Sequence, residues 1–335
     1  MKQLLKLSAA SLLVVGALTV QASTLSDVQA KGYVSCGVSK GLAGFSAADS
    51  AGNWTGVDVD VCRAVAAATL GDAQKVKFVP LTAKERFTAL QSGEIDMLSR
   101  NTTWTITRDA SLGLNFAGVN YYDGQGFMVK SSLGVSSAME LSGAAVCIQA
   151  GTTTELNLAD WGKANGIEYN SVVSDTNAQT LTNYDAGRCD VLTTDASGLY
   201  SMRAAANDPS EHVVLPEIIS KEPLGPVVRQ GDDQWFNIVR WSLNAMITAE
   251  ELGVTSATVD EVTNNPERER LMGRSGSTHE YVGLTPDWTY QIVKQVGNYS
   301  ESFERNIGIN TPIGIARGVN ALWTDGGILY SPPFR

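Results

Sequence analysis

The sequence has little histidine, no closely spaced cysteines and no second long apolar run after its N-terminal segment. Only two histidines, His212 and His279, occur among 335 residues, and none of the four cysteines forms a CxxC pair, so no metal site is expected. No segment of the remaining chain reaches the ~18 apolar residues of a membrane helix. The net charge of −10 argues against nucleic acid as a partner, because an acidic surface repels phosphates.

The N-terminus has the pattern of a secretory signal peptide. Lys2 and Lys6 precede an apolar run over residues 12–20, and a small residue, Ala22, closes the segment. We expect residues 1–22 to be a signal peptide cleaved after Ala22; the alternative is a buried N-terminal helix. Cleavage would remove two lysines and no acid, and would send the mature chain to an exported compartment.

An exported compartment is oxidising, so an even number of cysteines indicates disulfides. Four cysteines allow three pairings, and we favour Cys36–Cys62 with Cys147–Cys189, because each pair lies within one half of the chain. The alternative is a set of buried free thiols.

Two stretches of the chain alternate short β-branched runs with helical patterns. In the first, strands are predicted over 33–38, 76–79 and 95–98, with helices between them. In the second, strands are predicted over 144–148, 172–173 and 189–192, again separated by helices. Each stretch is a βαβαβ unit, which predicts an α/β fold with mostly parallel sheets.

The segments 122–129 and 223–228 flank the second unit and combine glycine or proline with short extended runs. They predict paired connecting strands, with lobe 1 formed by 23–127 and 229–335 and lobe 2, residues 128–228, inserted into it. The alternative is two ordinary surface loops. Residues 288–335 are expected to form a surface extension over the first unit.

Several motifs together resemble one family. They are Gly56-Val57-Asp58-Val59-Asp60, residues 89–96, Thr105-Ile106-Thr107-Arg108, residues 149–153, Gly187-Arg188-Cys189-Asp190 and Thr194-Asp195. In order and spacing they resemble solute-binding protein family 3, the periplasmic amino-acid-binding proteins of ABC importers, over residues 31–250. The cysteine pairs and the long C-terminal extension are similar to those of its general L-amino-acid-binding subgroup.

The resemblance implies an α/β fold of the periplasmic-binding-protein type II kind, with two lobes joined by two hinge strands. It also implies a periplasmic protein that binds L-amino acids between its lobes and delivers them to the permease subunits of an ABC importer, without a cofactor. Residues 151–153 are not followed by the Gly-Lys-Ser/Thr of a phosphate-binding loop, so a nucleotide site of that kind is not expected.

An enclosed amino acid needs a cation for its carboxylate and an anion for its ammonium, because desolvating either charge alone is costly. Arg108 and Asp195 follow strands of different units, at the strand ends where α/β sheets bind ligands. The resemblance implies that Arg108 binds the α-carboxylate and Asp195 the α-ammonium. It also implies that the hydroxyls of Thr103 and Thr105 and the backbone N–H of Thr153 help to hold the carboxylate.

The resemblance also bears on specificity. Leu42 lies near a position where many family members have an aromatic residue, and glycines surround it. Arg86 is expected to project toward the side-chain end of the pocket. Small and flexible residues around Leu42 predict that many L-amino acids are accepted.

Simpler roles exist for the two charged residues. Arg108 could pair with Asp109 at the surface, and Asp195 could cap the helix that follows it. For the whole chain, one alternative is an enzyme on the same fold, similar to cyclohexadienyl or arogenate dehydratases. It is disfavoured because no extra carboxylate or histidine occupies the matched pocket positions. A sensory amino-acid-binding module is the other alternative.

Overall fold

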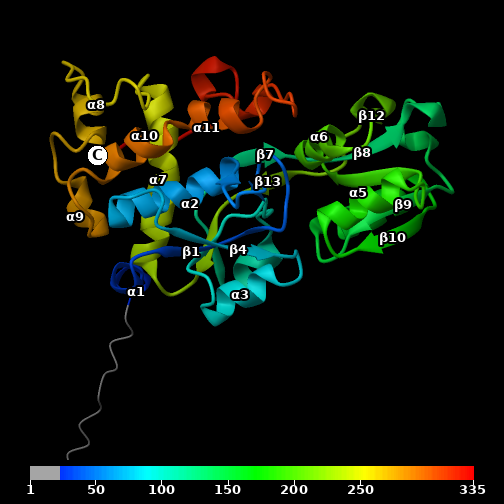
Figure 1. Cartoon of the computed structure of the whole chain (residues 1–335), viewed down its shortest axis with the longest axis horizontal. Helices are drawn as coiled ribbons and strands as arrows, with labels where there is room; N and C mark the ends of the chain where they lie inside the picture. Colours follow the sequence, from blue (N-terminus) through cyan, green and yellow to red (C-terminus); the bar gives the residue numbers. More distant parts are fainter. Residues whose placement is uncertain (1–22) are drawn as a thin grey trace, which may run out of the picture.

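The computed structural model describes residues 23–335, so the predicted signal peptide lies outside the described residues. Two α/β bodies lie side by side and are joined by a narrow connection (Figure 1). Lobe 1 is here the body built on the first sheet and lobe 2 the body built on the second. Among residues 23–335, no helix has the length and apolar character needed to cross a bilayer.

The first sheet has the strand order β4-β1-β5-β14-β6. The parallel strands are β1 (Val34–Ser39), β4 (Val76–Leu81) and β5 (Met97–Leu98). The fourth, β14 (Val227–Arg229), runs antiparallel to β5 and to β6 (Leu114–Phe116). Helices α2 (Val57–Leu70) and α3 (Arg86–Ser92) lie on opposite sides of this sheet (Figure 1).

The second sheet repeats this topology with the order β10-β9-β11-β8-β12. Only its fourth strand, β8, is reversed, because it pairs antiparallel with both of its neighbours. The strands are β8 (Gln125–Lys130), β9 (Ala145–Gln149), β10 (Asn170–Ser174), β11 (Val191–Asp195) and β12 (His212–Val214), and the helices are α4 (Thr153–Asn165), α5 (Asn177–Asp185) and α6 (Ala196–Ala205). Both predicted βαβαβ units are therefore present, each extended by one reversed strand and one further edge strand.

Two short strands connect the lobes. Strand β7 (Tyr121–Asp123) pairs antiparallel with β13 (Glu222–Leu224), which places Glu222 opposite Asp123. After β13, a Cβ on Gly225 would lie 1.9 Å from the carbonyl oxygen of Gly118, so the two connections approach too closely for a side chain there. The predicted pair of connecting strands is thus a hydrogen-bonded ribbon.

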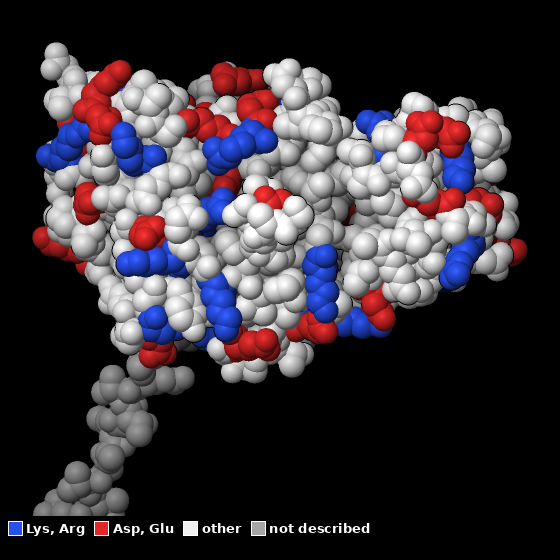
Figure 2. Space-filling model, in the orientation of Figure 1, with Lys and Arg blue, Asp and Glu red and all other residues white. Residues whose placement is uncertain are grey.

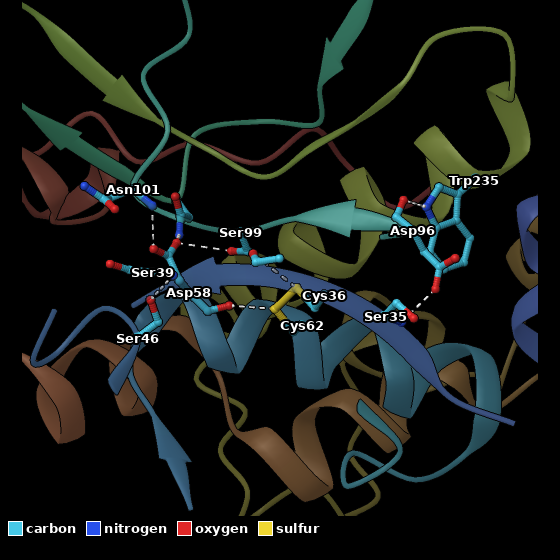
Figure 3. The surroundings of a disulfide bond; sticks show 12 residues. Ser35, Cys36, Ser39, Ser46, Asp58, Cys62, Asp96, Ser99, Asn101 and Trp235 are labelled. Atoms are coloured by element: carbon cyan, nitrogen blue, oxygen red, sulfur yellow. Dashed lines mark hydrogen bonds between the residues drawn. A yellow bond between two sulfur atoms is a disulfide. The ribbon is translucent and has the colours of Figure 1, made fainter. Parts of the chain in front are cut away.

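Each lobe contains one disulfide. The Cys36–Cys62 bond joins β1 to α2, with 6.1 Å between the Cα atoms (Figure 3). The Cys147–Cys189 bond joins β9 to the segment before β11, with a Cα separation of 5.6 Å. Neither bond crosses between the lobes.

The C-terminal region completes the core of lobe 1. Helices α7 (Asp233–Glu251), α10 (Trp288–Val296) and α11 (Tyr299–Asn306) pack with α2 in one apolar cluster. The expectation of a surface extension is therefore wrong for α10 and α11, whose apolar faces are buried. The remaining α-helices and strands described in this lobe are α1 (Thr24–Lys31), β2 (Ala47–Ala48), β3 (Trp54–Thr55), α8 (Pro266–Leu271) and α9 (Thr278–Val282).

Candidate functional site

A buried aspartate at the start of α2 shapes the loop that follows β5. The carboxylate of Asp58 accepts hydrogen bonds from the Asn101 N–H at 2.7 Å, the Ser99 hydroxyl at 3.1 Å and the Asn120 amide at 2.9 Å (Figure 3 labels the first two partners). Asn101 has a positive φ of 32°, a conformation that most residues avoid. The Gly-Val-Asp motif therefore determines where this loop leaves the sheet.

Arg108 lies in the short helical turn Thr107–Ser111, which follows this loop, and it is buried. Its Nη1 donates to the carbonyl oxygen of Thr103 at 2.9 Å, and its backbone N–H donates to the Thr105 hydroxyl at 3.3 Å. Asp109 accepts instead from the indole N–H of Trp104 at 2.8 Å. Arg108 is thus not a surface residue paired with Asp109, and the Thr105 hydroxyl supports the turn.

Asp195 ends β11 and occupies the position just before α6, but its side chain does not cap that helix. The cap comes from Asp123 of β7, whose carboxylate accepts the Ser197 backbone N–H at 3.3 Å and the Ser197 hydroxyl at 2.5 Å. Burial raises the pKa of the Asp195 carboxyl, and the Asn101 side chain and the Arg86 guanidinium, both of lobe 1, act in the opposite direction. Groups of the other lobe therefore influence this carboxyl.

The charges of the two lobes act on each other. Burial lowers the pKa of the Arg108 guanidinium, and the carboxylates of Glu222 and Asp195 act in the opposite direction. Burial and the neighbouring carboxylates raise the pKa of the Asp195 carboxyl well above its ordinary value. The Thr103 and Thr153 hydroxyls, one from each lobe, lie 3.4 Å apart. The site is consequently a buried, polar contact between lobes.

Glu222, a further residue of this site, was not predicted from the sequence. Glu222 is 2% exposed and accepts four hydrogen bonds. The donors are the hydroxyls of Thr103 at 2.5 Å, Thr153 at 2.9 Å and Ser220 at 2.7 Å, and the Asn157 amide at 2.5 Å. Nothing in the local sequence around Glu222 signals this role, because its partners are up to 119 residues away.

Arg86 begins α3 and is 2% exposed. Its Nη1 makes one long hydrogen bond of 3.5 Å to the Thr102 hydroxyl, and its Nε has no partner among residues 23–335. Burial lowers its pKa well below the usual range, and the charge of Arg108 lowers it further. A buried guanidinium with a free donor is suited to an anionic or carbonyl-bearing ligand group.

Leu42 lies where the lobes meet. It is buried, and it lines a cavity of about 150 Å³ together with residues of α5 and α6 from lobe 2. Beside it, the Ser201 hydroxyl donates to the carbonyl oxygen of Ala43 at 2.8 Å. Leu42 therefore takes part in the contact between lobes.

An ion pair between Lys84 and Asp175, with 2.8 Å between Nζ and Oδ1, also joins lobe 1 to lobe 2. Both side chains are largely exposed. Figure 2 shows acidic and basic side chains next to each other at the lower edge of the boundary between the two bodies. With these contacts formed, the lobes are in a closed arrangement.

Comparisons with known proteins identify the family. Residues 34–258 match the bacterial extracellular solute-binding proteins, family 3. The chain belongs to this family. It is 62% identical to the general L-amino acid-binding periplasmic protein AapJ of Rhizobium johnstonii, over 97% of each chain. It is 56% identical to the glutamate/glutamine/aspartate/asparagine-binding protein BztA of Rhodobacter capsulatus, over 96% of each chain.

A solved structure of a related solute-binding protein agrees with this fold. It is the ABC transporter periplasmic binding protein from Brucella ovis with glutathione bound, which is 57% identical, has a TM-score of 0.92 and covers 94% of this chain and 100% of its own. The predicted two-lobe fold of the periplasmic-binding-protein type II kind is confirmed. These relatives are named as binding proteins, the Brucella ovis protein as that of an ABC transporter, in agreement with the prediction that the chain is not an enzyme.

Proposed function

We propose that this solute-binding protein binds L-amino acids between its lobes and delivers them to the membrane permease of an ABC importer. The observation that carries the proposal is a buried arginine, Arg108, on lobe 1 and a buried aspartate, Asp195, on lobe 2, beside a contact between lobes. Arg108 donates to the carbonyl oxygen of Thr103, whose hydroxyl lies 3.4 Å from that of Thr153 in lobe 2. The expected lobe bounds at 127/128 and 228/229 shift to the connecting strands, because β8 pairs within the second sheet from Gln125 and β14 pairs within the first sheet from Val227. Lobe 2 is then the part of the chain between β7 and β13. The protein reaches the periplasm through a signal peptide cleaved after Ala22.

The two ends of an amino acid fit the two charges. A planar guanidinium binds a carboxylate through two hydrogen bonds, and Arg108 serves the α-carboxylate in this way. Thr153 is the first residue of α4, so its backbone N–H adds a donor with the favourable field of a helix start. Asp195 accepts from the α-ammonium. Binding therefore replaces the solvation that both ligand charges lose.

The side-chain end of the site is less selective. Leu42 offers apolar surface and Arg86 a free hydrogen-bond donor. The site can therefore contact both apolar and polar side chains of a bound amino acid. The relatives support this breadth: the BztA name gives four amino acids, and the Brucella protein holds glutathione, whose glutamyl residue has a free α-ammonium and α-carboxylate. These ligands share the amino-acid ends and differ in their side chains.

Binding is coupled to hinge closure. A ligand that carries both charges contacts both lobes, and it stabilises the closed arrangement over an open one by that difference in contacts. Bending is confined to the β7–β13 ribbon and the segments that continue it. The permease recognises the closed arrangement.

Calorimetry with substituted proteins tests the proposal. We expect wild-type protein to bind L-leucine and L-glutamate but not their D-enantiomers. Arg108→Ala and Asp195→Ala each remove one partner of a buried charge pair, which costs about 2–5 kcal/mol, so affinity falls at least tenfold. Arg335→Ala, whose side chain is 72% exposed, serves as the control. Unchanged affinity in either of the first two variants would refute the assignment.

A further inference from the structure

Glu222 lies on the connecting strand β13, and its carboxylate accepts hydrogen bonds from hydroxyls of both lobes. We infer that Glu222 is a positioning residue of the amino-acid site. Its carboxylate accepts hydrogen bonds from the hydroxyls of Thr103 and Thr153, so that both hydroxyl oxygens face the ligand's ammonium as acceptors. The inference rests on the proposed function. It revises the expectation that the Thr103 hydroxyl donates to the carboxylate.

The direction of the two protons follows from the distances. A hydroxyl has one proton and two lone pairs, and an ionised carboxylate only accepts. The Thr103 and Thr153 oxygens lie 2.5 and 2.9 Å from the same Glu222 oxygen, Oε2, but 3.4 Å from each other. Since hydrogen bonds to a charged oxygen are the stronger ones, both protons point to Glu222. Each hydroxyl is then left with lone pairs only.

Glu222 itself has no capacity left for a ligand. A carboxylate has about four lone-pair positions. Two donors reach Oε2, and the other two, Ser220 and Asn157, reach Oε1 at 2.7 and 2.5 Å. Because all four positions are filled by the protein, Glu222 acts on a ligand through the two threonines.

The position of Glu222 links this polarity to closure. Thr103 belongs to lobe 1 and also forms a backbone bridge with Leu224 of β13, whereas Thr153 and Asn157 belong to α4 of lobe 2. An opened hinge separates the two threonines, so Glu222 retains both only in the closed arrangement. Two acceptors from different lobes then join Asp195 around the ammonium, and the anionic character of that end of the site increases on closing.

Glu222→Gln tests the inference, because glutamine keeps the shape but has an amide that must donate. Its single oxygen can replace only one of the two carboxylate oxygens, so the threonine hydroxyls either face the amide nitrogen or keep a neutral acceptor, which holds their protons less firmly. We expect the Kd for L-glutamate to rise about tenfold. L-2-Hydroxyglutarate, which has no ammonium, should lose much less, so that the affinity ratio between the two ligands, measured by competition calorimetry, shrinks by a similar factor.

Further variants separate positioning from stability. The paired Thr103→Val and Thr153→Val variant removes both hydroxyls and should shrink the same ratio. Adding Glu222→Gln to it should have little further effect, since residues that act as a unit are not additive. Glu217→Gln is the matched control, because the Glu217 carboxylate also holds a hydroxyl, that of Ser137 at 2.6 Å, but within lobe 2. We expect it to bind like wild type.

The outcomes distinguish the two proposals. Wild-type protein that binds no amino acid refutes the proposed function. If wild type binds but Glu222→Gln keeps its affinity, or loses it equally for both ligands, the inference about Glu222 is wrong while the proposed function stands. Should Glu222→Gln not fold, an unchanged ligand ratio in the threonine variant would still overturn the inference.

Discussion

At the scale of single residues, the roles of Asp123 and Asp195 cannot be predicted from their neighbours in the chain. An aspartate just before a helix usually caps it, and Asp195 has that position. The cap of α6 comes instead from Asp123, which lies 74 residues before Ser197 in the chain and meets it only through the fold. The Asp195 side chain therefore has no part in the cap of α6.

Asp123 predicts a pH dependence of stability. Burial raises the pKa of its carboxyl from 3.8 to about 6. The folded protein therefore holds this proton at pH values where the unfolded chain has lost it, so the contribution of Asp123 to stability is full below about pH 4 and declines as the pH rises through 6. The side chain is partly exposed, so we expect on the order of 1–2 kcal/mol.

Urea unfolding at pH 4.5 and pH 7 measures this effect in wild type and in Asp123→Asn. Asparagine retains an oxygen that accepts the Ser197 N–H but does not titrate. The difference in unfolding free energy between the two proteins should thus change with pH, in favour of wild type at the lower pH. A difference that is constant across this range would contradict the raised pKa.

At the scale of elements, the sequence pattern predicted those helices and strands whose bounds depend on residues close to them in the chain. The start of α2 after Gly56 is one case: this glycine has a φ of 134°, and a Cβ there would lie 2.0 Å from the Phe45 carbonyl oxygen. The reversed strands β8 and β14 were not predicted, because direction depends on how the chain returns from the other lobe. The core position of α10 was missed although Trp288, Ile292 and Val296 mark its apolar face.

The first disulfide should stabilise lobe 1 with little effect on the site. The bond between Cys36 and Cys62 closes a loop of 26 residues. It reduces the conformational entropy of the unfolded chain and so raises the free energy of unfolding by about 3 kcal/mol. Replacing both cysteines with alanine should lower the unfolding free energy by about that amount in urea titrations. Ligand affinity should stay within about twofold, since Asp58 still holds the loop after β5.

The corresponding alanine variant of Cys147 and Cys189 provides the comparison in lobe 2, where the closed loop has 42 residues. An unfolding free energy equal to that of wild type in the first variant would show that α2 is held by packing alone.

At the scale of the whole molecule, the site depends on contacts that exist only between lobes. The paired connecting segments predicted two lobes and placed Arg108 and Asp195 on different ones. The sequence could not predict Glu222, whose hydrogen-bond partners come from three separate segments and which lies on the connection itself. Residues far apart in the chain meet there only once both lobes have folded and closed.

The exposed Lys84–Asp175 pair should affect how long the lobes stay closed. An exposed ion pair is worth about 0.2–1 kcal/mol, and this one forms only between closed lobes. Asp175→Asn should therefore speed ligand dissociation about two- to threefold in stopped-flow measurements and leave association unchanged. Because salt screens exposed charges, the difference should vanish near ~1 M salt. A persistent difference there would indicate another cause.

The chain passes between the two bodies twice, through the segments that continue β7 and β13, and each body contains one disulfide that stays within it. A protease that nicks either passage would leave two fragments with no covalent bond between them, because in both cases each disulfide joins cysteines of the same fragment. The nicked protein would still behave as one particle under native conditions, since both fragments contribute to the apolar core of lobe 1. Electrophoresis under denaturing, non-reducing conditions would therefore separate two fragments, whichever passage is cut.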